Sequence, residues 1–299
     1  MNRARIVYVT GMKPKPPPDV HRQQLTRVLA AGLARVRPGC ESWLAERPEN
    51  FTLVSWTSLL YDFRRDIALD LPGIERLLES PHPTREQRRE IDSLARFVAR
   101  QWHVFGDSFP WLTRFIASPA LKLTLADVHR YLGDADGVGG RIRALLKTAL
   151  AAARAAGERV LLVGHSLGSV IAYDTLWELS REAGVSTRVD LLTLGSPLAT
   201  RFIRRSLKGA GLPLPERYPA MIARWHNMTA RAEMVALHPR LEPFFAPMIA
   251  LGLTQCIEDR VDIYNHFQGP AGLDVHKSYG YLNHAAVAGF IGDWIASGS

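Results

Sequence analysis

Cysteine is almost missing from this chain of 299 residues, which contains only Cys40 and Cys256. The two lie far apart in sequence and match no C-x-x-C spacing, which excludes a disulfide framework and a zinc-finger arrangement. Isolated thiols of this kind are typical of small buried residues in a reducing compartment. We therefore expect a cytoplasmic protein.

Long hydrophobic runs are missing as well. A membrane-spanning helix needs ~18 uninterrupted apolar residues, whereas the longest run in the C-terminal third, residues 244–253, is broken by Pro247 and Gly252. A strand-like segment, residues 6–9, begins so early that no signal peptide fits before it. We expect a soluble protein without an export signal.

Blocks of like charge are the third absence. Lys and Arg outnumber Asp and Glu by 37 to 29, which gives a net charge of +8. The cationic residues are spread along the chain, and no RNA-binding signature occurs, so we do not expect nucleic acid as a partner. An Arg-rich solvated surface explains this pattern. Weak association with an anionic membrane surface, or with an acyl-carrier partner, remains open.

Short apolar segments alternate with helical patterns along the chain. The expected strands are residues 4–10, 51–57, 159–164, 189–195, 221–228 and 260–266. The expected helices are residues 19–36, 84–104, 137–156, 167–181 and 279–296, with Asp19 as one N-cap and Thr84 with Gln87 in capping-box spacing. This alternation predicts one α/β domain over residues 1–299, with a mainly parallel sheet and helices on both faces.

The sheet pattern is suspended between about residues 62 and 133, where prolines interrupt helical stretches. We interpret this block as a helical cap or insertion over the sheet. Its aromatic side chains, among them Phe109, Trp111 and Phe115, form either the core of that cap or a wall facing a substrate. The proline run at residues 13–18 predicts a rigid extended loop.

The segment that carries chemistry is GHSLG at residues 164–168, which follows an apolar strand and opens a helix. A G-x-S-x-G motif in this setting is a nucleophile elbow, a tight turn that exposes a serine above the edge of the sheet. Gly164 and Gly168 let strand and helix approach each other, and Ser166 is the candidate nucleophile. We assign His165 a packing or hydrogen-bonding role.

These residues resemble those of the α/β-hydrolase superfamily, in its lipase- and esterase-like branch. The resemblance rests on GHSLGS and extends to four further landmarks. They are Thr10-Gly11 after the opening strand, LGSP at residues 194–197, WHN at residues 225–227 and VHKSY at residues 275–279. It implies an α/β-hydrolase fold in which the acid and then the histidine follow the serine along the chain.

A serine hydroxyl needs a histidine to take its proton and a carboxylate to orient that histidine. His276 fits the base, because it lies between the last expected strand and the final helix. His266, at the end of a strand, is the runner-up, and His284 fits a structural role on the final helix.

The acid is expected after the strand at residues 221–228, where residues 227–236 resemble the family's N-x-x-D-x-x-D-P-V-A loop. Glu233 occupies the position of the second Asp, and glutamate is an accepted orienter. Its rivals are Asp262, Asp259 and Asp274, of which Asp274 also fits a turn former.

Two backbone N–H groups complete the expected site. Leu167, directly after the nucleophile, supplies one donor to an oxyanion, and Met12, in the loop after the opening strand, supplies the other. The sequence thus predicts an esterase- or lipase-like serine hydrolase acting on small acyl esters, with no metal or cofactor. Cleavage of CoA or acyl-carrier thioesters and acyl transfer remain alternatives, as does a non-catalytic binding protein.

Overall fold

The computed structural model describes residues 3–105, 127–134, 136–184, 188–236 and 238–297. It contains a six-stranded sheet in the order β2-β1-β3-β4-β5-β6, and every neighbouring pair is parallel. The strands are β1 (Ala4–Val9), β2 (Phe51–Val54), β3 (Arg159–His165), β4 (Val189–Leu194), β5 (Ile222–Ala230) and β6 (Ile257–Ile263). A separate antiparallel pair joins β7 (Gln268–Gly269) to β8 (Gly272–Leu273).

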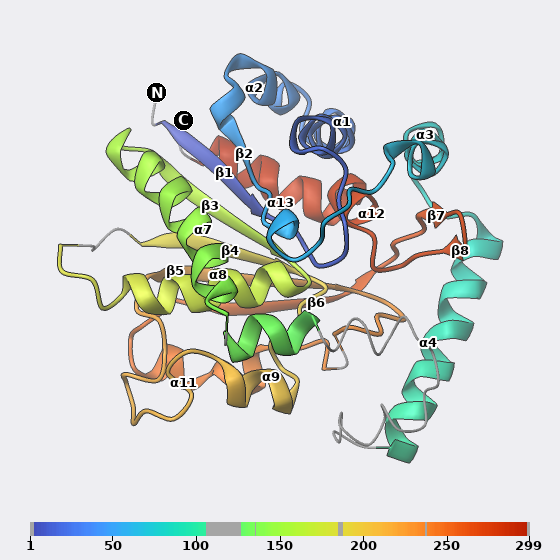
Figure 1. Ribbon diagram of the computed structural model, residues 1–299. Helices are drawn as coiled ribbons and strands as arrows, with labels where there is room; N and C mark the ends of the chain where they lie inside the picture. Colours follow the sequence, from blue (N-terminus) through green and yellow to red (C-terminus); the bar gives the residue numbers. More distant parts are fainter. Residues whose placement is uncertain (1–2, 106–126, 135, 185–187, 237, 298–299) are drawn as a thin grey trace.

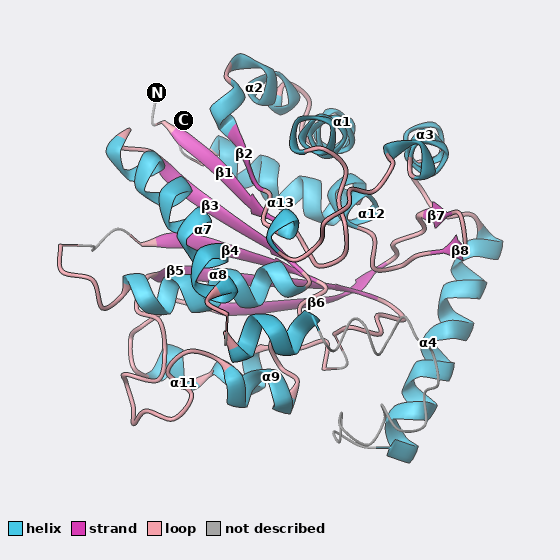
Figure 2. Ribbon diagram, viewed as in Figure 1, coloured by secondary structure: helices cyan, strands magenta, loops and turns pink. Residues whose placement is uncertain are grey.

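Helices cover both faces of the sheet (Figures 1 and 2). On one face α1 (Pro18–Val36) packs against α12 (Ser278–Asn283) and α13 (Ala285–Ala296). On the other, α7 (Val138–Ala155) packs against α8 (Leu167–Leu179) and the central strands. The remaining helices are α2 (Cys40–Glu46), α3 (Leu71–Glu79), α4 (Arg85–Phe105), α9 (Arg201–Ser206), α10 (Glu242–Phe245), α11 (Pro247–Ala250), η1 (Pro48–Asn50), η2 (Thr57–Leu59) and η3 (Ile67–Leu69).

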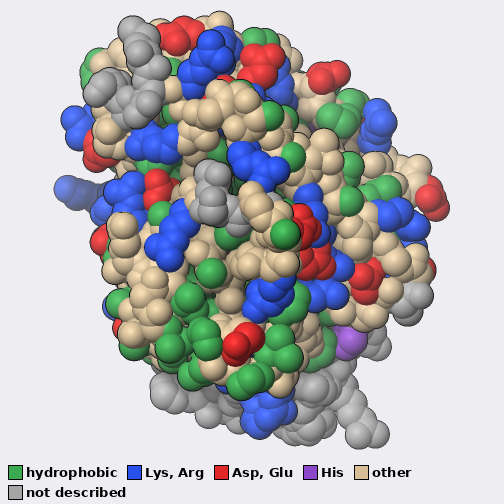
Figure 3. Space-filling model, turned by 90° about the vertical axis from the view of Figure 1, so that its left-hand side faces the viewer, with side chains coloured by type: hydrophobic (Ala, Val, Ile, Leu, Met, Phe, Trp, Pro, Cys, Tyr) green, Lys and Arg blue, Asp and Glu red, His purple; other side chains and the backbone are tan. Residues whose placement is uncertain are grey.

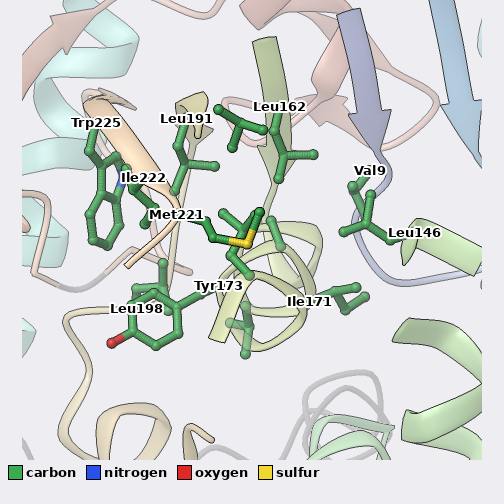
Figure 4. Packing of buried hydrophobic residues seen from close by; sticks show 14 of the residues in the cluster. Val9, Leu146, Leu162, Ile171, Tyr173, Leu191, Leu198, Met221, Ile222 and Trp225 are labelled. Atoms are coloured by element: carbon green, nitrogen blue, oxygen red, sulfur yellow. The ribbon is translucent and has the colours of Figure 1, made fainter. Parts of the chain in front are cut away.

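Side chains that alternate along each strand divide the core into two layers. Val9 of β1 and Leu162 of β3 join the layer under α7 and α8, whereas Tyr8 and Leu161 join the layer under α1 and α13. Figure 4 shows the first layer, where Val9 and Leu162 point from the sheet toward Ile171 of α8. Because both faces are buried, the strands are apolar throughout, as parallel strands usually are.

The sheet has a topological switch point at β1, because the chain adds β2 on one side of β1 and then β3 on the other side. In open parallel sheets, the crevice at the carboxyl end of such a switch point is where ligands bind. Ser166 directly follows β3, and the loop of Met12 follows β1. The topology therefore places both candidate segments at this one crevice.

The predicted parallel α/β architecture is confirmed, and the capping box of α4 forms as expected. The Gln87 N–H donates to Thr84 Oγ1 over 3.2 Å, and the Thr84 N–H donates to Gln87 Oε1 over 2.9 Å. The predicted cap for α1 is wrong: the helix starts with Pro18 at its first position, which places Asp19 in the first turn. Proline fits there, because the first helical N–H needs no partner.

The boundaries of β2 and β6 and of the final helix also differ from the prediction. β2 ends at Val54 because η2 begins three residues later, and β6 spans Ile257–Ile263. The expected last helix is two helices, α12 and α13, separated at His284, which has extended backbone and caps α13 by accepting the Ala286 N–H at Nδ1.

The predicted insertion begins too early. Helix α3, within residues 62–84, packs on α1 and α12 and so belongs to the main body. The described helices of the insertion between β2 and β3 are α4, which begins at Arg85, and α7, which ends at Ala155. Asp92 of α4 bonds to Arg231 and Tyr264, which follow β5 and β6, so α4 lies at the carboxyl end of the sheet. Phe109, Trp111 and Phe115 lie outside the described residues.

His284 makes folding sensitive to acid. Burial, with a smaller contribution from the Arg260 guanidinium, lowers its pKa from 6.5 to about 4. The unfolded chain therefore takes up a proton at higher pH than the folded chain does, so stability is lost as pH falls from about 6.5 toward 4. We expect His284→Asn, which keeps a cap acceptor, to show a shallower fall in urea-unfolding free energy between pH 7.5 and 4.5. Parallel curves for the two proteins would contradict this.

Candidate active site

The GHSLG segment forms a strained turn between β3 and α8. Ser166 has φ of 54° and ψ of −129°, an uncommon conformation for a residue with a side chain. Its N–H donates to the Leu194 carbonyl of β4 over 2.9 Å, and its carbonyl accepts the Ser169 hydroxyl over 2.6 Å. These bonds hold the serine at the N-terminus of α8, where the helix dipole favours negative charge.

Two glycines, Gly168 and Gly11, let the loop after β1 lie directly against this turn. Gly164 pairs with Val9 in the sheet, and a β-carbon at Gly168 would lie 2.3 Å from the Val9 carbonyl oxygen. A β-carbon at Gly11 would lie 2.9 Å from Ser166 Cβ. Side chains at either glycine would force the two loops apart, so their absence lets the Gly11 loop reach the serine.

Met12 directly follows Gly11 and Leu167 directly follows Ser166, so both residues expected as oxyanion donors adjoin the contact between the two segments. Leu167 is the first residue of α8, and its N–H is one that a helix leaves without an internal partner. The Met12 loop is fixed through its carbonyl, which accepts Lys15 Nζ over 2.8 Å, and through the Lys13 N–H, which donates to the Tyr61 hydroxyl.

The structure brings His276 and Glu233 together. The Nδ1–H of His276 donates to Glu233 Oε2 over 2.8 Å, and the Glu233 side chain is only 2 % exposed. The histidine comes from the loop before α12, and the glutamate from the turn after β5. Gly195, at φ of 54°, lies against both, since a β-carbon there would lie 2.9 Å from Glu233 Oε2.

Tyr281 supports Glu233, and no sequence pattern pointed to this tyrosine. Its hydroxyl donates to Glu233 Oε2 over 2.9 Å and accepts the Ala230 N–H over 2.8 Å. The Val235 N–H donates to the other carboxylate oxygen over 3.1 Å. A buried carboxylate needs such donors, because an unpaired charge in the interior is costly. Four residues lie between His276 and Tyr281, and no motif marks that spacing.

His165 contacts His276 directly. Its Nε2–H donates to the His276 carbonyl over 2.8 Å, and the two ring centroids lie 4.7 Å apart. Burial first, and then the His276 ring, hold the pKa of His165 well below its ordinary value of 6.5. It is therefore neutral at pH 7 and ties the nucleophile turn to the loop of His276.

The rival carboxylates are engaged elsewhere. Asp259 accepts the Asn227 side chain and the Leu241 N–H, and Asp262 pairs with Arg260. Asp274 accepts the His276 backbone N–H over 3.1 Å, which is a contact within the turn. It does not bind the His276 ring, which bonds to Glu233.

The rival histidine is also elsewhere. His266 donates from Nε2 to the Ser80 carbonyl over 3.0 Å. Among the candidates, the structure thus joins Glu233 alone to the ring of His276.

A cluster of charges lies beside the Met12 loop, and the sequence did not single it out. The buried Asp70 carboxylate accepts Lys277 Nζ and the Arg65 guanidinium, each over 2.8 Å. Burial and the Lys277 ammonium lower the pKa of Lys15 to about 7. These contacts fix Lys277, and so the position of the adjacent His276.

The Ser166 hydroxyl and the His276 ring share no hydrogen bond in the described structure. Catalytic hydrogen bonds are often long without substrate and tighten only in the complex. The His276 side chain is 26 % exposed, so its second ring nitrogen is not enclosed by the core.

The described residues contain no group of three or more His, Cys, Asp or Glu side chains that could hold a metal ion. Within the same part of the chain, no helix is both long and apolar enough to cross a bilayer.

Comparisons with protein-family models, with curated proteins and with solved structures found no match to this chain.

Gly168→Ala tests the close approach of the two loops. The added methyl group meets backbone oxygens that cannot move aside, so we expect a loss of about 1–3 kcal/mol in unfolding free energy. Gly140→Ala in α7 is the matched control. The nearest atom to its added carbon is 3.7 Å away, and we expect a gain of about 0.5–1 kcal/mol. Urea unfolding measures both, and equal effects would refute this account of the turn.

Proposed function

We propose that this protein is a serine hydrolase of the α/β-hydrolase type that cleaves carboxylic esters through an acyl-enzyme intermediate. The observation that carries the proposal is the 2.8 Å bond from His276 to the buried Glu233, at the same sheet edge as the strained Ser166. Support also comes from the chain order of serine, acid and histidine, which this fold type uses.

In the proposed reaction, Ser166 Oγ attacks the ester carbonyl carbon while His276 Nε2 takes the hydroxyl proton. The carbonyl oxygen becomes an oxyanion, which the N–H groups of Met12 and Leu167 stabilise. His276 then gives its proton to the leaving alkoxide, so an alcohol departs and the acyl group stays on Ser166. Water, deprotonated by His276, attacks this acyl-enzyme and releases the carboxylic acid.

Glu233 acts in this mechanism through His276. Its carboxylate accepts the Nδ1–H, which keeps Nε2 as the basic nitrogen and stabilises the imidazolium formed during attack. The Tyr281 hydroxyl and the Val235 N–H hold the carboxylate in place. The role predicted for Glu233 from the altered loop at residues 227–236 is thus the one that the proposal keeps.

The same residues would cleave a thioester or transfer the acyl group to an alcohol, since only the leaving group or the acceptor changes. Parallel assays with esters, thioesters and alcohol acceptors would therefore distinguish ester hydrolysis from thioester hydrolysis and acyl transfer. A non-catalytic binding protein would use the pairing of His276 with Glu233 only to hold its loops together, and its serine would not react with an activated-serine probe.

A fluorophosphonate probe tests the nucleophile. We expect it to label the wild-type protein at Ser166 and to leave Ser166→Ala unlabelled, because only an activated serine reacts readily with the probe. Mass spectrometry of the labelled peptide identifies the labelled residue. Ser42→Ala serves as the control, because Ser42 is exposed and lies far from Ser166 in the sequence. Labelling that persists in Ser166→Ala would refute the assignment.

Hydrolysis of p-nitrophenyl esters tests the acid. We expect Glu233→Gln to lower kcat by about 10³- to 10⁴-fold, because an amide no longer holds the histidine in the required tautomer. Asp262→Asn, which removes a surface carboxylate, should leave kcat within about twofold. Near-normal turnover by Glu233→Gln would remove this residue from the mechanism.

A further inference from the structure

Positive charge is concentrated in α9 and in the loop that leads from it toward β5. Residues 201–217 contain five Lys and Arg side chains and a single carboxylate, Glu216. This excess of four positive charges is half of the net charge of +8 of the whole chain. Uncharged residues are interspersed among these cations, so the segment does not stand out in the sequence as a block of like charge.

Four of these cations line one cavity of about 270 Å³. They are Arg204, Arg205, Lys208 and Arg217. The described lining includes no carboxylate, and within the described chain none of the four side chains pairs with one. Arg204 and Arg217 instead donate through Nε to backbone carbonyls, over 3.0 and 3.2 Å. Cations gathered in a concave site without acids attract an anion.

The buried Asp174 carboxylate interacts with the charge of Lys208 but forms no ion pair with a lining cation among the described residues. Its two oxygens accept the Lys208 backbone N–H over 2.9 Å and the Tyr131 hydroxyl over 3.0 Å, beneath the loop. The cavity floor is aromatic instead, with Phe245 and Tyr173 both buried. Figure 4 shows the Tyr173 hydroxyl directed away from the sheet.

Exposed apolar side chains follow the lining residues of this cavity along the chain. Leu212 and Leu214, in the loop, are 39 % and 50 % exposed, and Leu212 offers its carbonyl to Arg217. Ile249 and Leu251 follow α10, whose phenylalanines line the cavity, and are 38 % and 40 % exposed. These four make up half of the large hydrophobic residues exposed in the described chain.

Figure 3 views the molecule from the side on which α11 and the loop before β5 lie in Figure 1. Hydrophobic side chains gather in the lower part of this face around one acidic side chain, with Lys and Arg side chains above and below them and further acidic side chains above. Apolar groups beside cations are the pattern by which peripheral proteins bind an anionic bilayer.

We propose that the face formed by residues 201–218 and 242–251 docks on an anionic phospholipid bilayer. A head-group phosphate enters the cationic cavity, and the exposed leucines enter the boundary of the acyl chains. A cavity of about 270 Å³ suits a compact charged group such as a head-group phosphate. Pockets for drug-sized ligands are larger, at ~300–1,000 Å³. This surface is separate from Ser166, so the inference does not depend on the proposed hydrolysis.

Vesicle flotation tests the proposal. The full chain should float with vesicles of equimolar phosphatidylcholine and phosphatidylglycerol but not with phosphatidylcholine alone. Raising the salt from ~0.1 M to ~1 M, which shortens the Debye length from ~10 Å to ~3 Å, should release most of it. We expect Arg205→Gln/Lys208→Gln to weaken binding about tenfold or more, and Leu212→Asp/Leu214→Asp to do the same.

Matched controls separate this face from general charge and hydrophobicity. Arg89→Gln/Arg141→Gln removes two exposed cations elsewhere, and Leu145→Asp alters an exposed leucine on α7. Both controls should bind within about twofold of the wild-type protein. Urea unfolding of every variant reports whether the fold is intact, independently of any reactivity of Ser166.

Three results would overturn the proposal. They are equal binding to both vesicle types, equal losses in the controls and the docking variants, and binding of soluble pyrophosphate without binding of vesicles. The last result would assign the cavity to a soluble phosphorylated ligand.

Discussion

The parallel pairing of β1 with β3 is the constraint on which the candidate site depends. Val9 lies opposite Gly164 in this pair, so the two chains leave the sheet side by side. Gly168 then lies against the Val9 carbonyl with no room for a side chain. This contact sets the position of Ser166 on one loop and of Met12 on the other. The strain at Ser166 persists because the sheet, α8 and the Leu194 carbonyl fix the residues around it.

The rest of the site is held by buried polar groups, each with a partner. Glu233 is removed from water, and its charge is offset by His276, by the Tyr281 hydroxyl and by a backbone N–H. The neutral His165 connects the nucleophile turn to the His276 backbone. Such networks are rigid when complete, since removing one member leaves another unpaired. The arrangement thus suits a base that must keep one orientation while its protons move.

Helix α8 relates the two surfaces proposed to be functional. Ser166 caps its first turn, and Tyr173, further along, forms part of the floor of the cationic cavity. A bilayer that binds the α9 and α10 face would therefore contact elements packed directly on the helix that begins beside Ser166, the proposed nucleophile. Docking by this face would hold the protein at a surface rich in acyl esters, which links the two proposals without making either depend on the other.

The sequence alone determined the α/β alternation and the elbow, because both are local: β-branched runs, helical periodicity and two glycines around a serine act over short distances. It also pointed to His276 and Glu233, through chain order and loop resemblance. Only the tertiary structure decided what depends on distant segments meeting. It joined Glu233 instead of Asp259 or Asp262 to His276, added Tyr281, and folded the cations of one segment around a single cavity. Spacing along a chain does not record which loops share a sheet edge, so packing alone made these choices.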